Sequence, residues 1–108
     1  RRDAAMKKFK PEHPGKFLER ELKRFQLPKK PTAENLQIAR TTLYRIIDGE
    51  LDVTVELALK LEAAFGYPAD HWLSLQLEYD LWKARKSANV TGIRRMVREQ
   101  IQAEFAML

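Results

Sequence analysis

The stretch 36–54, LQIARTTLYRIIDGELDVT, constrains the fold of this chain more than any other segment. Its apolar residues Leu43, Ile46 and Ile47 follow the i, i+3, i+4 spacing of one face of an α-helix. The pair Asp48-Gly49 ends the pattern, because glycine readily adopts the left-handed conformation that terminates a helix. We therefore predict a short helix that packs on a small core through this apolar face.

The opposite side of the predicted helix, which runs from about 40 to 48, is polar and basic. It carries Arg40, Thr41, Thr42, Tyr44 and Arg45. A helix of this kind can dock on a core and present donors outward, as the second helix of a helix-turn-helix does in a major groove. Any surface helix of a small domain also has one apolar and one polar face, so periodicity alone leaves both interpretations open.

The chain before this helix should begin with an arm and a first helix. Residues 1–12 show no periodicity, and we expect them to form a flexible basic arm. The segment 13–15, His-Pro-Gly, then opens a helix, because proline fits the first turn, where its missing N–H costs little. The apolar side of this helix is Leu18, Leu22 and Phe25.

Two further helices flank the central one. A short helix should begin at or after Lys30 with Pro31 in its first turn, since proline in a helix interior costs about 3 kcal/mol. Thr54 suits the N-cap of a helix over 55–65, which Gly66 ends. No long strand-like alternation occurs, so the predicted class is all-α.

The longest predicted helix, 69–86, is apolar on two faces. One face carries Trp72, Leu75, Tyr79 and Trp82, and the other carries Leu73, Leu77 and Leu81. One face can meet the core, and a second of this size calls for another partner, most economically a copy of the chain. We therefore assign a dimer or partner interface to Trp72, Leu73, Leu77 and Leu81. The alternative is that the chain itself covers this helix all round.

The segment 87–108 is expected to add one C-terminal helix. Ser87–Val90 forms a linker, and Thr91 caps the helix. The expected apolar stripe is Ile93, Met96, Val97, Ile101, Phe105 and Leu108. We assign the helix-turn-helix domain itself to residues 13–86.

Composition excludes several classes of function. The absence of cysteine removes disulfides, zinc ribbons and thiol catalysis, and it fits a cytosolic protein. No apolar run approaches the ~20 residues that would span a bilayer. The only histidines, His13 and His71, show no metal-ligand spacing, and the four glycines form no phosphate loop. We predict no catalytic or metal-binding residue, no cofactor and no enzymatic activity, and we expect His71 to be a surface or packing residue.

Charge is distributed unevenly along the chain. Residues 1–30 hold eleven Lys and Arg against four Asp and Glu, a net charge of +7, and the rest has a net charge of −2. A basic N-terminal third suits nucleic acid, although solvated lysines on an arm explain the same bias.

Three strings in the order HPGKFLEREL, IARTTLYRIIDGE and VELALKLEAAFGYPADHWLSLQLEYDLWKARK carry a family resemblance. Together they resemble the HigA-type antitoxins of bacterial toxin–antitoxin modules, within the Xre-type helix-turn-helix superfamily that includes phage repressors. The resemblance covers about His13–Lys86, and its most specific part is the string around His71–Leu81.

The resemblance implies a five-helix, lambda-repressor-like domain that dimerises and binds the operator of its own operon in double-stranded DNA. It also implies binding and silencing of a RelE-like toxin that cleaves mRNA. Carried over by position, the DNA-facing residues are Arg40, Thr41, Thr42, Tyr44 and Arg45. Lys29 matches the start of the family's second helix, where a phosphate contact is common.

The chain departs from the family pattern at three places. Gln37 and Ala39 stand where glycine and serine are usual, and Glu50-Leu51-Asp52 replaces a basic pair after the recognition helix. Ala39 removes a capping hydroxyl, a loss of about 1 kcal/mol. These departures keep two alternatives open: a protein-interaction module with weak or lost DNA binding, and a phage-type transcriptional regulator.

Overall fold

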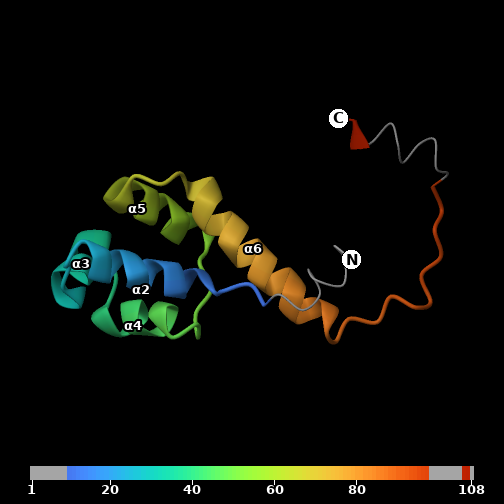
Figure 1. Cartoon of the computed structure of the whole chain (residues 1–108), viewed down its shortest axis with the longest axis horizontal. Helices are drawn as coiled ribbons and strands as arrows, with labels where there is room; N and C mark the ends of the chain where they lie inside the picture. The colour runs from blue at the N-terminus through green and yellow to red at the C-terminus, as the bar shows by residue number, and fades with distance from the viewer. Residues whose placement is uncertain (1–9, 98–105, 108) are drawn as a thin grey trace.

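Residues 10–97 of the computed structural model, which describes these and residues 106–107, form five α-helices and no β-strand (Figure 1). The helices are α2 (Pro14–Arg24), α3 (Lys29–Leu36), α4 (Arg40–Ile47), α5 (Val55–Phe65) and α6 (Ala69–Arg85). Figure 1 shows α2 to α5 gathered at one end, with α6 running out from them. The all-α class is confirmed, and none of the described helices is long and apolar enough to cross a membrane.

The core lies where these helices meet, and it is built from one side of each. Trp72 of α6 is 0% exposed and lies 5.2 Å, ring to ring, from Phe17 of α2. Buried apolar side chains from all five helices surround it; they include Leu18, Leu22, Leu36, Leu43, Ile47 and Leu61. Burial of this apolar surface is the main stabilising contribution to a domain of this size.

The predicted helix boundaries hold to within about two residues. Helix α3 begins at Lys29, one residue earlier than expected, and has Pro31 in its first turn as predicted. The Thr54 hydroxyl accepts a hydrogen bond from the Leu57 N–H at 3.2 Å, which confirms Thr54 as the N-cap of α5. Gly66 ends α5 in the left-handed conformation, at φ 86°.

Phe25 does not join the apolar side of α2 as expected. Its side chain is 52% exposed, because α2 ends at Arg24 and the next residues turn away from the helix. Gln26 adopts φ 53°, and the Leu27 N–H donates to the Leu22 carbonyl at 2.8 Å. The turn therefore removes Phe25 from the face that carries Leu18 and Leu22.

The helix expected to start at Thr91 is absent over residues 91–97, so this prediction is wrong there. The segment forms turns instead, in which the Ile93 N–H donates to the Val90 carbonyl at 3.0 Å. Its apolar side chains do not pack on the described part of the chain, and a short helix owes most of its stability to such packing. The other members of the expected stripe, Ile101, Phe105 and Leu108, lie outside the described residues, as do residues 1–9 of the expected arm.

Helix α2 packs directly on the backbone of α4 at Gly15. A Cβ atom added at Gly15 would lie 1.8 Å from the carbonyl oxygen of Ile46 and 3.0 Å from the Cα atom of Ile47. Real Cβ atoms do not approach other atoms this closely, so only glycine permits the two helices to lie at this separation. The contact fixes α4 against α2 without an intervening side chain.

Gly15→Ala should therefore lower the free energy of unfolding by about 1–3 kcal/mol or more, the cost of overpacking a site whose neighbours are backbone atoms. Gly92→Ala is the matched control, because an added Cβ there meets nothing within 4 Å. Urea denaturation of both variants measures the difference. Equal stability of the two variants would show that α2 and α4 are not in this contact.

Candidate nucleic-acid interface

A tight turn, Gln37–Ala39, joins α3 to α4. Gln37 adopts the left-handed conformation at φ 58°, and the Ile38 N–H donates to the Ala33 carbonyl at 3.0 Å, which closes α3. Non-glycine residues pay roughly 1–2 kcal/mol in this conformation, so Gln37 makes the turn at a cost in stability. Ala39 caps α4 without a side-chain hydrogen bond, as its lack of a hydroxyl predicts.

Helix α4 has one buried and one exposed side. Leu43, Ile46 and Ile47 are at most 2% exposed, so the apolar face predicted from their spacing lies in the core. The structure places four of the predicted DNA-facing residues on the exposed side: Arg40, Thr41, Tyr44 and Arg45. Because the buried side chains hold the helix, these four are presented to solvent from a fixed backbone.

Lys29, the first residue of α3, lies beside the exposed side of α4. Its ammonium group is 5.4 Å from the centre of the Tyr44 ring, within the range of a cation–π contact. The structure thus brings together Lys29 and the exposed residues of α4, which are separated by more than ten positions in the sequence.

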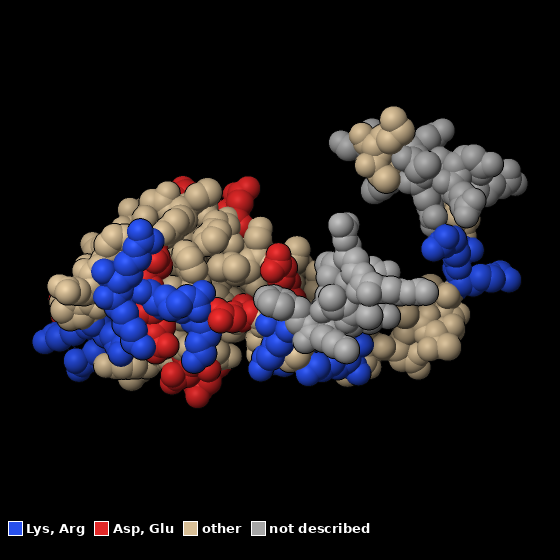
Figure 2. Space-filling model, in the orientation of Figure 1, with Lys and Arg blue, Asp and Glu red and all other residues tan. Residues whose placement is uncertain are grey.

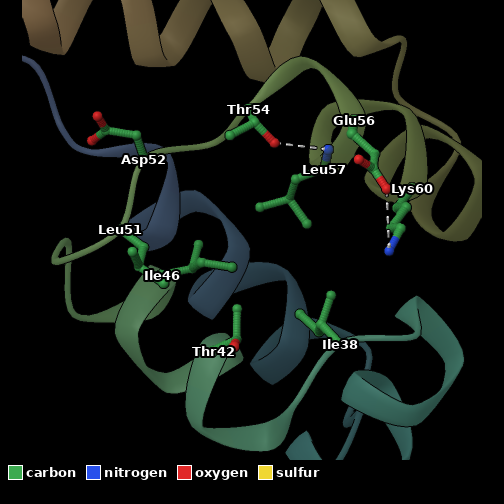
Figure 3. Close-up of a pocket in the computed structure, with 9 residues that line it drawn as sticks. All are labelled: Ile38, Thr42, Ile46, Leu51, Asp52, Thr54, Glu56, Leu57 and Lys60. Atoms are coloured by element: carbon green, nitrogen blue, oxygen red, sulfur yellow. Dashed lines mark hydrogen bonds and ion pairs between the residues drawn. The ribbon is translucent and has the colours of Figure 1, made fainter.

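Thr42 is the exception among the predicted DNA-facing residues. It is half-buried and lines a hollow of about 250 Å³ between α4 and α5, together with Ile38, Ile46 and Leu57 (Figure 3). Thr42 therefore lies toward α5 and away from the most exposed side of α4.

Acidic side chains follow α4 directly and interact with its basic residues. The Nε atom of Arg45 lies 3.6 Å from a carboxylate oxygen of Glu50, and both side chains are more than half exposed. Asp48 and Asp52 are exposed as well. Figure 2 shows basic and acidic side chains side by side over the end of the molecule that holds α2 to α4. Glu50 consequently competes with any anionic ligand for Arg45.

His13 joins three parts of the structure, a role that the sequence analysis missed. Its Nδ1 atom accepts a hydrogen bond from the Gly15 N–H at 3.0 Å, which caps α2. Its ring packs edge-on against Tyr79 of α6, with the ring centres 5.1 Å apart. A Cβ atom added at Gly49 would touch the His13 Cβ at 3.7 Å. His13 therefore holds the start of α2, the end of α4 and the middle of α6 together.

Gln76 of α6 is a second buried polar residue that sequence reasoning missed. Its amide oxygen accepts from the Val53 N–H at 2.7 Å, and its amide nitrogen donates to Asp52 at 3.2 Å and to Asp80 at 2.9 Å. These bonds attach the loop after α4 to α6. Its position in the sequence could have indicated burial, because Gln76 lies four residues after Trp72, on the helix side that faces the core.

Burial lowers the pKa of His13 below its usual value of 6.5, because desolvation opposes the charged imidazolium. The negative charges of Asp52 and Asp80 act in the opposite direction and do not outweigh burial. The neutral ring leaves Nδ1 free to accept the hydrogen bond that caps α2.

The described residues include no group of three or more His, Cys, Asp or Glu that could hold a metal ion. His71 packs in an aromatic cluster, with its ring centre 4.8 Å from that of Phe17 and 5.3 Å from that of Tyr67. His71 is thus a packing residue, one of the two roles predicted for it.

The interface predicted on α6 needs one correction. Trp72 is fully buried in the core of its own chain, so its assignment to an interface is wrong. Leu73 is half-buried against the same core. Leu77 and Leu81 are 58% and 40% exposed, so these two side chains form the apolar surface that α6 presents outward.

No family model matches the chain, but individual proteins do. It is 31% identical over 84 residues to the uncharacterised HTH-type transcriptional regulator YddM of Escherichia coli (strain K12), an alignment that covers 78% of this chain and 89% of YddM. It is 38% identical over 56 residues to the antitoxin HigA-1 of Vibrio cholerae. This alignment covers 52% of each of the two chains.

Solved structures of antitoxins also resemble this chain. An addiction-module antidote protein of the HigA family from Coxiella burnetii superimposes with a TM-score of 0.76 at 28% identity, over 82% of this chain and 100% of that one. The antitoxin HigA of Pseudomonas aeruginosa, solved with the higBA promoter, superimposes with a TM-score of 0.70 at 28% identity, over 82% and 97%.

The lowered pKa of His13 predicts that the fold weakens in mild acid. The folded state binds fewer protons than the unfolded state, so stability is full above the unfolded pKa and falls as the pH drops below it. Taking the wild type from about pH 7.5 to about pH 5.5 should lower its urea midpoint. His13→Asn keeps a capping side chain and removes the titration, so its midpoint should fall less. An equal fall in both proteins would exclude His13 as the cause.

Proposed function

Because the chain belongs to the family of helix-turn-helix transcriptional regulators that includes the HigA-type antitoxins, we propose that it is an antitoxin that represses its own operon. In this proposal a dimer binds operator DNA through α4 of each copy. The same protein neutralises a RelE-like, mRNA-cleaving toxin in the cytoplasm.

The exposed side of α4 is the observation that best supports DNA binding. Arg40 and Arg45 project from a helix whose other side is buried, and arginine forms paired hydrogen bonds with the edge of guanine. Thr41 can meet a thymine methyl group or a phosphate, and Lys29, whose ammonium group lies beside the Tyr44 ring, can meet a phosphate. Solved structures of PA4674 and of the antitoxin HigA, both from Pseudomonas aeruginosa, contain operator or promoter DNA.

Leu77 and Leu81 support a dimer, because two exposed leucines one turn apart on α6 can pack on the same two leucines of a second copy across a two-fold axis. A two-fold dimer that binds both half-sites places its recognition helices in successive major grooves, about 34 Å apart.

A second candidate function is a protein-interaction module with weak DNA binding. The contact between Arg45 and Glu50 favours it, as do the exposed carboxylates of Asp48 and Asp52 beside the same helix. Each basic contact that is neutralised lowers the number of counterions released on binding. A steep fall of DNA affinity with salt supports the repressor, and a shallow or absent one supports the interaction module.

Toxin neutralisation is supported by the family alone. The gene next to this one in its operon should encode a small protein whose expression arrests growth and mRNA translation. Co-expression of the present chain should restore growth. Failure to restore growth, with a complex absent in purified mixtures, would exclude the antitoxin role.

Operator binding should depend on the two arginines of α4. Arg40→Ala with Arg45→Ala should reduce affinity for the upstream operator strongly, since each base contact is worth about 1–3 kcal/mol. Glu50→Gln should act in the opposite direction, because it removes the carboxylate that pairs with Arg45. Fluorescence anisotropy over a series of salt concentrations measures both effects.

The matched control is Arg20→Ala with Arg85→Ala, which removes the same charge from exposed positions on α2 and α6. This control should retain most of the affinity. An equal loss in both double variants would mean that net charge, and not the α4 surface, determines binding.

Dimerisation should depend on the exposed leucines of α6. Leu77→Asp with Leu81→Asp should give a folded monomer in analytical ultracentrifugation, because charges cannot be buried at the contact without a large desolvation cost. Leu59→Asp is the control, since Leu59 is 54% exposed on α5. Loss of the dimer in the control but not in the α6 variant would place the interface on α5.

A further inference from the structure

The segment Val90–Val97 exposes apolar side chains that the described chain does not cover. Val90, Ile93 and Met96 are 65%, 74% and 92% exposed. The same segment carries Arg94 and Arg95, both exposed, and no acidic residue. Figure 1 shows it leaving the end of α6 and running clear of the helices. A basic stretch with exposed apolar side chains calls for an acidic surface with an apolar hollow.

The hollow between α4 and α5 has an apolar floor. Figure 3 shows Ile38, Ile46 and Leu57, from the α3–α4 turn, α4 and α5, directed toward one space. Its volume is about 250 Å³. Pockets for drug-sized ligands begin at about 300 Å³, so this hollow suits an inserted side chain better than a small molecule.

The rim of the same hollow is acidic. Asp52 and Glu56 line it, and their side chains are 71% and 83% exposed. Lys60 is the one basic residue in the lining, and it lies 3.9 Å from Glu56. Residues 48–56 contain four acidic residues and no basic one. A partner that enters this hollow therefore gains from positive charge beside an apolar side chain.

We propose that residues 90–97 of one copy dock in the α4–α5 hollow of a second copy. Met96 or Ile93 enters the hollow, and Arg94 and Arg95 lie over Asp52 and Glu56. Both surfaces are exposed in the single chain, and they match in charge and in apolar character. The inference does not require that the protein bind DNA or a toxin.

The course of the chain favours a second copy over the same copy. Gln76 binds Val53 beside the hollow, and Lys86 lies ten residues further along, about 15 Å at the rise of an α-helix. To reach its own hollow the segment would have to reverse and retrace α6. Figure 1 shows it running away from the helices, where it can meet another copy without reversal.

Disulfide trapping tests the proposal, because the chain contains no cysteine and each introduced thiol is therefore unique. Full-length Met96→Cys is mixed with full-length Leu51→Cys, whose side chain lines the hollow, and oxidised under dilute conditions. The control partner is Lys23→Cys, an exposed position on α2. Thermal unfolding of each variant establishes that it is folded before mixing.

The mixed disulfide should form with Leu51→Cys on the order of tenfold faster than with the control, since the bond requires Cα atoms within about 7 Å. Adding Arg94→Glu and Arg95→Glu to the Met96→Cys chain should remove the difference. Adding Asp52→Lys and Glu56→Lys to the partner chain should then restore it.

Equal rates with both partners would overturn the proposal. So would a disulfide within a single chain that carries both cysteines, formed while the mixed dimer stays at the control level, because that result places the segment in its own hollow.

Discussion

The contact between Gly15 of α2 and the backbone of α4 is the constraint on which the candidate interface depends. It leaves no room for a side chain, so α2 acts as a rigid support under the helix that presents Arg40 and Arg45. The buried residues Leu43 and Ile47 then fix the rotation of α4 about its own axis. Together, these contacts determine which side chains face outward.

Two buried polar residues secure the remaining end of α4. His13 lies 3.9 Å from Asp52 in the loop after α4 and packs on α6, and Gln76 binds the same loop through the backbone of Val53. Buried hydrogen-bonding groups define geometry more narrowly than apolar contacts, because each must keep its partner to offset desolvation. The loop they hold is the one that carries the acidic residues next to Arg45, so the same network that orders α4 also sets the charge beside it.

Local patterns in the sequence predicted most of the helices and the sides of α4, because a helix face and a cap depend on residues within a few positions of one another. Thr54 as a cap and Leu43 in the core are of this kind. The contacts of His13 with Tyr79 and of Gln76 with Val53 could not be predicted, because the two residues of each pair lie more than twenty positions apart. The stripe that begins at Ile93 has helical spacing, but spacing does not say whether a surface exists to pack against. The assignment of Trp72 to an interface was wrong because spacing alone does not show which apolar face of α6 packs on the core of its own chain.

The family and the exposed side of α4 agree on a DNA-binding role, whereas the acidic loop after α4 opposes close approach of phosphates. The most direct measurement is an amide chemical-shift map of the isotope-labelled protein titrated with its operator duplex. The largest shifts should fall on α4 and on the start of α3 around Lys29, with little change along α5. Shifts confined to α5 and α6, or none at concentrations that saturate a related repressor, would contradict the account.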